Sequence, residues 1–125
     1  MMNNRNSRKK RQYLFYLEDM LDSMEKISNY ISGLELDAFR KDELIQDAVI
    51  RNFEVIGEAA KHIPDRVKNK YPKIPWYNMS KLRNFLAHQY FGVDIPMIWR
   101  IARDHIPGHK IDMQEIVERE RVLAG

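Results

Sequence analysis

Apolar residues recur at steps of three and four along most of this chain, and this spacing constrains the fold more than any other feature. One such stripe runs through residues 11–32, with Gly33 as its expected end. A second begins somewhere between Asp37 and Asp42 and continues to Ile63, where Pro64 ends it. Steps of three and four place apolar side chains on one face of an α-helix. No stretch alternates apolar and polar residues for long enough to indicate a strand. The sequence therefore predicts an all-α fold.

Three further helices are expected after these two. The connection 64–76 contains three of the five prolines, which predicts an irregular segment with one or two helical turns. We expect a third helix to end near Gly92, a fourth to begin at Asp94 and end at Pro107–Gly108, and a fifth to begin at Asp112. The prediction is a bundle of about five helices joined by short loops.

The chain has 125 residues, 44% of them hydrophobic, which suits one domain with one core. Residues 1–11 contain five basic and no acidic residues and are expected to form a basic flexible tail before a domain at 12–125. That domain has 16 basic against 18 acidic residues, a formal net charge of −2. The tail is a weak indication of contact with nucleic-acid phosphates, since such tails more often only solvate a terminus.

Several classes of protein are excluded by what the sequence lacks. Without cysteine there is no disulfide framework, thiolate zinc site or cysteine nucleophile, and a reducing cytoplasm is the expected location. The longest apolar run is Tyr13–Leu17, whereas a membrane-spanning helix needs about 20 residues. We therefore expect no contact with a membrane.

The third predicted helix carries an unusual polar arc. At about 100° per residue, several functional side chains fall on one side of this helix, opposite its apolar face. The members of the arc are Arg83, Asn84, His88 and Tyr90, with the small residues Ser80 and Ala87 beneath them. The small residues leave room for a ligand or for another chain.

These residue types could cleave RNA without a metal. A base must take the proton from the 2′-hydroxyl, and a cation must stabilise the charge that develops on the phosphorus oxygens. His88 is the candidate base and Arg83 the candidate cation, while Asn84, one turn before His88, could orient the imidazole. The alternative is a solvated or interface face, which is the commoner role of such an arc.

The string Arg83–Tyr90 resembles the R-x4-H-x-Y motif of the HepT-like ribonuclease toxins, within the HEPN superfamily. The segment Ile50–Ala60 resembles the long second helix of that family, and Pro75–Trp76, Asp94 and Trp99 fall at family positions. The likeness extends from about Tyr13 to about Glu120. Two motifs in order and at family spacing make the resemblance specific.

The resemblance implies a homodimeric, metal-independent endoribonuclease that acts on RNA without a cofactor. It also implies a type VII toxin–antitoxin system, in which a cognate minimal nucleotidyltransferase antitoxin transfers AMP from ATP onto Tyr90. If the third helix continues through Tyr90, an adenylate there would crowd and neutralise the phosphate clamp at Arg83.

The second predicted helix has two features of its own. Charged residues at steps of three and four include Arg51 and Glu58, and they form either a surface ion-pair ladder or, as the resemblance implies, a support for the catalytic helix. Gly57 lies inside the helix, where glycine costs about 1 kcal/mol relative to alanine. A close approach by another helix would explain it.

A metal site is not expected. His105 and His109 are four residues apart, but Pro107–Gly108 should break the helix that would align them, and further ligands are lacking.

Two other functions stay open at this point. The bundle could be a non-catalytic nucleotide- or partner-binding subunit of a nucleotidyltransferase, in which Arg83 and His88 only grip phosphate. It could also bind RNA through its tail.

Overall fold

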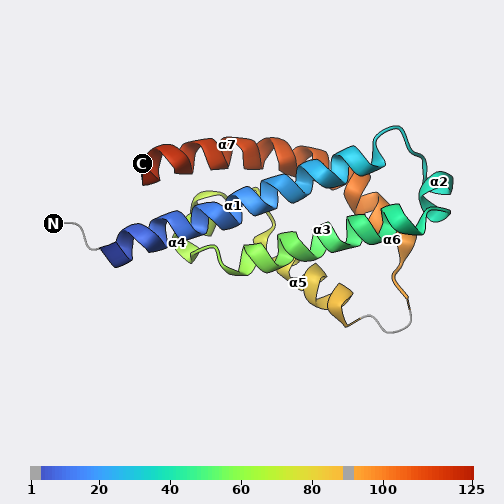
Figure 1. Ribbon diagram of the computed structural model, residues 1–125, viewed down its shortest axis with the longest axis horizontal. Helices are drawn as coiled ribbons and strands as arrows, with labels where there is room; N and C mark the ends of the chain where they lie inside the picture. The colour runs from blue at the N-terminus through green and yellow to red at the C-terminus, as the bar shows by residue number, and fades with distance from the viewer. Residues whose placement is uncertain (1–3, 89–91) are drawn as a thin grey trace.

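The computed structural model describes the backbone of residues 4–88 and 92–125 and the side chains of residues 12–88 and 92–125. Within these ranges the chain forms seven α-helical segments, one π-helical turn and no strand (Figure 1). They are α1 (Asn4–Ile31), α2 (Leu36–Arg40), α3 (Glu43–Lys61), α4 (Asp65–Lys70), α5 (Trp76–Ala87), α6 (Ile95–Arg100), η1 (Ile101–His105) and α7 (Ile106–Ala124). The predicted all-α class is confirmed.

The long helices lie side by side in the order α7, α1, α3 and α5 (Figure 1). Helix α1 runs antiparallel to both α3 and α7, and α5 runs antiparallel to α3. The largest packing interfaces join α3 with α5, α1 with α3, and α1 with α7. Helix α1 is therefore the central element of the bundle, and α5 packs mainly against α3.

The apolar stripe of α1 forms the centre of the core, as its spacing predicts. Leu17, Met20, Met24 and Ile27 are fully buried, and Val49 of α3 is buried with them. Each such side chain stabilises the fold by about 1.5–3 kcal/mol relative to an exposed position. Methionines are prominent here because their unbranched side chains fill irregular gaps.

Several predicted helix ends are confirmed by capping contacts. The Asp42 carboxylate accepts a hydrogen bond from the Ile45 N–H at 3.0 Å, and the Asp94 carboxylate accepts one from the Met97 N–H at 3.1 Å. Gly33 follows α1 with a φ of 76°, a left-handed conformation that favours glycine. The connection 64–76 contains the single short helix α4, as its prolines indicated.

The first helix begins earlier in the chain than the sequence predicts. Helix α1 begins at Asn4, not near Arg11, so the backbone of residues 4–11 is helical where a flexible tail was expected. The physical reason lies in the residue types. Arginine and lysine, which make up five of the eight residues 4–11, are good helix formers, and no proline or glycine interrupts the segment.

The expected helix break at Pro107–Gly108 is wrong. Helix α6 passes through η1 into α7 without interruption, and the Ile106 N–H donates to the Ile101 carbonyl, five residues back. This wider π turn places Pro107 in the first turn of α7, where a missing N–H costs little. Asp112 consequently lies inside α7 and does not begin a helix.

A buried carboxylate ties α7 to α1 and α4. The Glu120 side chain is fully buried and accepts hydrogen bonds from the Tyr13 hydroxyl at 2.8 Å, the Lys70 ammonium at 2.8 Å and the Tyr71 hydroxyl at 2.6 Å. Burial alone would raise the pKa of Glu120, but these three bonds outweigh it and lower the pKa. Burial and the neighbouring carboxylate raise the pKa of Tyr71 to about 12. The Glu120 carboxylate is therefore ionised at neutral pH, and its buried oxygens have hydrogen-bond donors.

Gly57 marks a close approach of α3 and α5, which confirms the sequence-based interpretation. A Cβ atom at this position would clash with the Arg83 Cβ and lie 2.5 Å from the Met79 carbonyl oxygen. The Ser80 hydroxyl donates to the Gly57 carbonyl at 3.4 Å across the same contact. No side chain larger than hydrogen fits between the two helices here.

We expect Gly57→Ala to lower the free energy of unfolding by about 1–3 kcal/mol, because overpacking outweighs the gain in helix propensity. Gly108→Ala is the matched control. Its added Cβ meets nothing within 4 Å, so this variant should be as stable as the wild type or more stable by up to about 1 kcal/mol. Urea unfolding of both variants makes the comparison. Equal stabilities of Gly57→Ala and the wild type would show that the helices can separate without cost.

Candidate active site

Helix α5 ends three residues before the predicted motif does. Its last helical residue is Ala87, and His88 leaves helical geometry with φ −111° and ψ 17°. The expectation that this helix continues to near Gly92 is wrong, since the histidine and aromatic residues that follow Ala87 have low helix propensities. Tyr90 lies outside the described residues. Its predicted angular position beside Arg83 assumed a continuous helix and does not follow from this structure.

His88 is held by the backbone of α5. Its Nδ1 lies 2.8 Å from the carbonyl oxygen of Asn84, one of the carbonyls left without an intrahelical partner at the helix end. A carbonyl can only accept, so Nδ1 carries the proton in this bond, and Nε2 holds the lone pair when the imidazole is neutral. The side chain is exposed. This tautomer suits a base that takes a proton from a bound molecule.

Arg83 is oriented by two partners. Its Nε lies 3.4 Å from Oε2 of Glu58, and its Nη1 donates to Oδ1 of Asn84 at 3.3 Å. The Arg83 side chain is one-third exposed, so part of the guanidinium faces solvent. An arginine has five N–H donors, and these two contacts leave donors available for a phosphate.

Glu58 is the acceptor at the centre of this group. Besides Arg83, its carboxylate lies 3.5 Å from the His62 Nε2 and 3.9 Å from the Lys61 Nζ. Lys61 also donates to Oδ1 of Asn84 at 3.1 Å. Lys61, which the motif did not include, thus links the end of α3 to α5. Its position one turn beyond Glu58 was the available signal.

The surface ion-pair ladder on α3 is not present. Arg51 has no ion pair within 4.0 Å among the residues whose side chains are described. It lines a hollow of about 230 Å³ together with Glu58, Arg83 and Ala87. The ion pair of Glu58 with Arg83 is the geometry that a supporting role would require, and Arg51 lines the same hollow.

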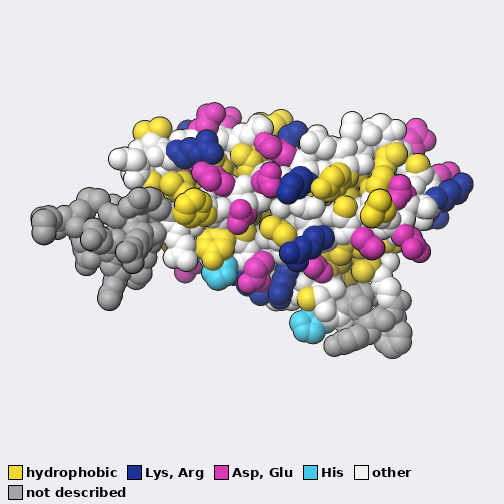
Figure 2. Space-filling view, viewed as in Figure 1, with side chains coloured by type: hydrophobic (Ala, Val, Ile, Leu, Met, Phe, Trp, Pro, Cys, Tyr) yellow, Lys and Arg dark blue, Asp and Glu magenta, His cyan; other side chains and the backbone are white. Residues whose placement is uncertain are grey.

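The charged site also contacts α1. Figure 2 shows basic and acidic side chains interspersed over the visible face of the molecule, including over α3 and α5. The ring of His62 stacks on Tyr16 of α1 with centroids 4.4 Å apart, and Tyr16 and Asp19 of α1 line the hollow at Arg83. The site therefore draws on three helices, α1, α3 and α5.

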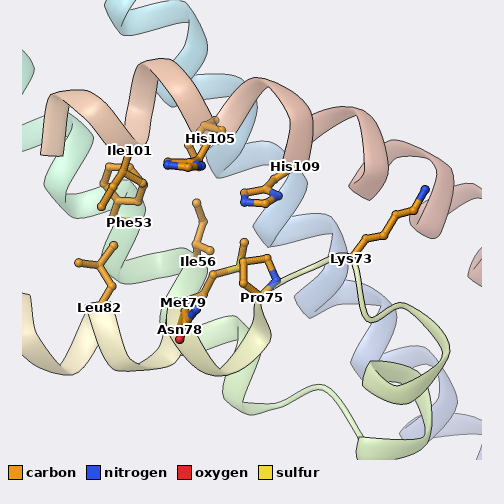
Figure 3. Close-up of a pocket in the computed structure, with 11 residues that line it drawn as sticks. Phe53, Ile56, Lys73, Pro75, Asn78, Met79, Leu82, Ile101, His105 and His109 are labelled. Atoms are coloured by element: carbon orange, nitrogen blue, oxygen red, sulfur yellow. The ribbon is translucent and has the colours of Figure 1, made fainter. Parts of the chain in front are cut away.

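A second cavity, of about 460 Å³, lies between α3, α5 and the η1–α7 junction (Figure 3). Its wall is apolar, with Phe53, Ile56 and Leu82 among its lining residues, and His105 and His109 lie above them. The two imidazole rings are stacked with centroids 6.4 Å apart, so the continuous helix aligns them after all. Burial and the neighbouring His105 lower the pKa of His109. This cavity shares no lining residue with the hollow at Arg83.

Within the described part of the chain, no three His, Asp or Glu side chains form a group that could hold a metal ion. In the same part of the chain, no helix is long and apolar enough to cross a membrane.

The described chain has the all-α fold of the HEPN-like class of small helical proteins. The chain belongs to the HepT-like ribonuclease family, since the family model described as "Ribonuclease HepT-like" matches residues 20–119. The resemblance found in the sequence is thereby confirmed, and so is the predicted ribonuclease class. No solved structure matches the chain significantly.

Curated proteins from several organisms are similar over most of their length. "Putative RNase MJ0127" of Methanocaldococcus jannaschii is 41% identical over 103 residues, which cover 82% of this chain and 85% of that protein. "Probable ribonuclease HepT" of Thermococcus cleftensis is 41% identical over 101 residues, 81% of this chain and 92% of that protein. "Putative RNase TTE0752" of Caldanaerobacter subterraneus is 34% identical over 106 residues, 85% of this chain and 95% of that protein.

The contact between His88 and a backbone carbonyl generates a test. Asn84→Ala removes the amide that contacts Lys61 and Arg83 but keeps the carbonyl that fixes the imidazole. We therefore expect His88 in this variant to stay in the tautomer with the proton on Nδ1. Long-range ¹H–¹⁵N correlation spectra, recorded where the imidazole is neutral, measure the tautomer directly. A shift of the proton to Nε2 would show that the amide, and not the backbone, sets it.

Proposed function

We propose that this chain is the toxin of a type VII toxin–antitoxin system, a metal-independent endoribonuclease that acts in the cytoplasm. His88 is its base, and Arg83 binds the scissile phosphate. Membership of the HepT-like ribonuclease family supports the reaction class. The observation that carries the site assignment is the 2.8 Å bond from His88 Nδ1 to the Asn84 carbonyl, which leaves the Nε2 lone pair available.

The reaction that suits these groups is an internal transesterification. His88 Nε2 takes the proton of the 2′-hydroxyl, the 2′-oxygen forms a bond to phosphorus, and the bond from phosphorus to the 5′-oxygen breaks. The leaving oxygen takes a proton from an imidazolium or from water. Arg83 stabilises the negative charge on the non-bridging oxygens during this step. The product ends are a 2′,3′-cyclic phosphate and a 5′-hydroxyl, and no cofactor is consumed.

A homodimer would complete this site. One chain supplies a single histidine at the end of α5, whereas the reaction needs both a base and an acid. Two-fold pairing brings the same surface of two copies together, so each site would gain the second copy's side chains. The partly exposed Phe85, next to Asn84 on α5, gives this face an apolar contact that a partner could bury.

The proposed control point is Tyr90. Tyr90 follows His88 by two residues in the sequence, and two residues of extended chain span at most about 7 Å. A cognate nucleotidyltransferase antitoxin would join the tyrosine oxygen to the α-phosphorus of ATP and release pyrophosphate. The resulting phosphodiester anion and adenosine would compete with RNA for Arg83.

The catalytic assignment predicts the behaviour of two variants. Expression of the wild-type chain without its partner should arrest growth, whereas His88→Ala and Arg83→Ala should relieve the arrest and remain folded dimers by light scattering. Purified wild-type protein should cut RNA in EDTA and leave 2′,3′-cyclic phosphate ends, and both variants should be slower by at least about 100-fold. Unchanged cleavage by His88→Ala would exclude it as the base. RNA binding without any cleavage by the wild type would favour the non-catalytic binding subunit.

The modification has its own test. After co-expression with a cognate nucleotidyltransferase, intact-mass spectrometry should detect added adenylate on the wild type and none on Tyr90→Phe. Because the phenol has no step in the reaction, Tyr90→Phe should retain most of the nuclease activity and escape neutralisation. Tyr77→Phe is the matched control and should still be modified. Neutralisation of an unmodified wild-type chain would instead indicate steric blocking by the partner.

A further inference from the structure

A second open hollow borders the candidate active site. It has a volume of about 710 Å³ and lies where the end of α3, helix α4 and the first turns of α5 meet. Lys61, Lys68, Tyr77, Asn78 and Ser80 are among the side chains that line it. Nothing in the catalytic assignment uses this hollow, which we call the α4–α5 groove.

The groove and the active site are joined through Lys61. This side chain lines the groove, and its ammonium donates to Oδ1 of Asn84, which in turn accepts from Arg83. Tyr77 and Asn84 lie on the same helix, seven residues apart, a rise of about 10 Å. At the stacked spacing of about 3.4 Å per nucleotide, this corresponds to about three nucleotides. A strand held at Arg83 can therefore extend into the groove.

Tyr77 offers an aromatic surface to solvent. Its side chain is 76% exposed, whereas the neighbouring Trp76 is buried with 6% exposure and donates its Nε1–H to the Tyr71 carbonyl. Trp76 therefore packs in the core, whereas the ring of Tyr77 is exposed to solvent. An exposed aromatic ring beside a basic groove is the usual stacking platform for an unpaired base.

The groove also favours anions. Lys61 and Lys68 contribute two positive charges, and Asp65 is the only acidic residue among its lining side chains. The first turn of α5 contains no acidic residue, and Pro75 at the N-cap has no side-chain acceptor for the free N–H groups. The positive end of the helix dipole thus adds to the two lysines.

We propose that the α4–α5 groove binds single-stranded RNA next to the cleavage site, with one base stacked on Tyr77 and an adjacent phosphate held by Lys61 and Lys68. This inference rests on the proposed ribonuclease function. The preference for a single strand follows from the stacking, because only an unpaired base can lie on the ring. Tyr77 is then a positioning residue that sets which stretch of RNA reaches His88.

The experiment measures RNA binding separately from cleavage. The ligand is a fluorescein-labelled, mixed-sequence single-stranded RNA of about 12 nucleotides, and His88→Ala protein serves as the non-cleaving background. In fluorescence anisotropy, adding Tyr77→Ala should weaken binding by about 5- to 100-fold, whereas adding Tyr77→Phe should leave it within about 2-fold. Tyr30→Ala, at a partly exposed tyrosine of α1 outside the groove, is the control and should bind normally.

An abasic scan identifies stacking itself. Removing the base at one nucleotide position of the RNA should weaken binding to the His88→Ala protein and have no further effect on the protein that also carries Tyr77→Ala. Lys68→Gln should weaken binding and lower the salt dependence by about one released counterion. Thermal unfolding checks that each variant is folded.

The two proposals fail in different ways. If the wild type cuts RNA but Tyr77→Ala binds it as tightly as the background protein does, the groove is not an RNA site. Base stacking on Tyr77 would also be excluded if duplex RNA bound as tightly as single-stranded RNA. The same holds if Tyr77→Phe lowered the RNA affinity as much as Tyr77→Ala. If RNA binds through Tyr77 but the wild type never cuts it, the groove stands and the ribonuclease assignment fails.

Discussion

The contact between α3 and α5 at Gly57 determines the geometry of the whole site. Because this residue has no side chain, the backbone of α3 reaches the Arg83 Cβ and the Met79 carbonyl. That distance is what allows Glu58 to reach Arg83 and Lys61 to reach Asn84. Helix α5 packs mainly against α3, so a wider contact would shift every functional side chain of α5 together.

The end of α5 matters as much as its packing. A helix leaves its last carbonyls without partners, and one of these, on Asn84, holds the imidazole of His88. Had the helix continued, that carbonyl would have accepted a backbone N–H and would be less available to the histidine. The side-chain oxygen Oδ1 of Asn84 separately accepts hydrogen bonds from Lys61 and Arg83. One residue thereby orients both proposed catalytic groups, the base through its backbone and the cation through its side chain.

The sequence was sufficient for the features that depend on periodicity and on local capping. The apolar stripes located α1 and α3. Gly33 marked the end of α1, Asp42 the start of α3 and Asp94 the start of α6. It was insufficient at Pro107, where a π turn absorbs the proline, because that choice depends on packing against α1 and not on the residues themselves. The motif supplied Arg83, Asn84 and His88. Lys61 is indicated in the sequence only by its position one helical turn beyond Glu58, and the exposed groove position of Tyr77 depends on how α3, α4 and α5 pack together.

The ion pair of Arg83 with Glu58 does not occupy the whole guanidinium. Arg83 and Lys61 share the carboxylate of Glu58, while Asp19, Arg51 and Glu54 line the same hollow. At least one edge of the guanidinium keeps unused donors while Nε and Nη1 are held. An arginine fixed in this way loses less conformational entropy when an anion arrives. Glu58 therefore preorganises the cation without occupying all of its donors.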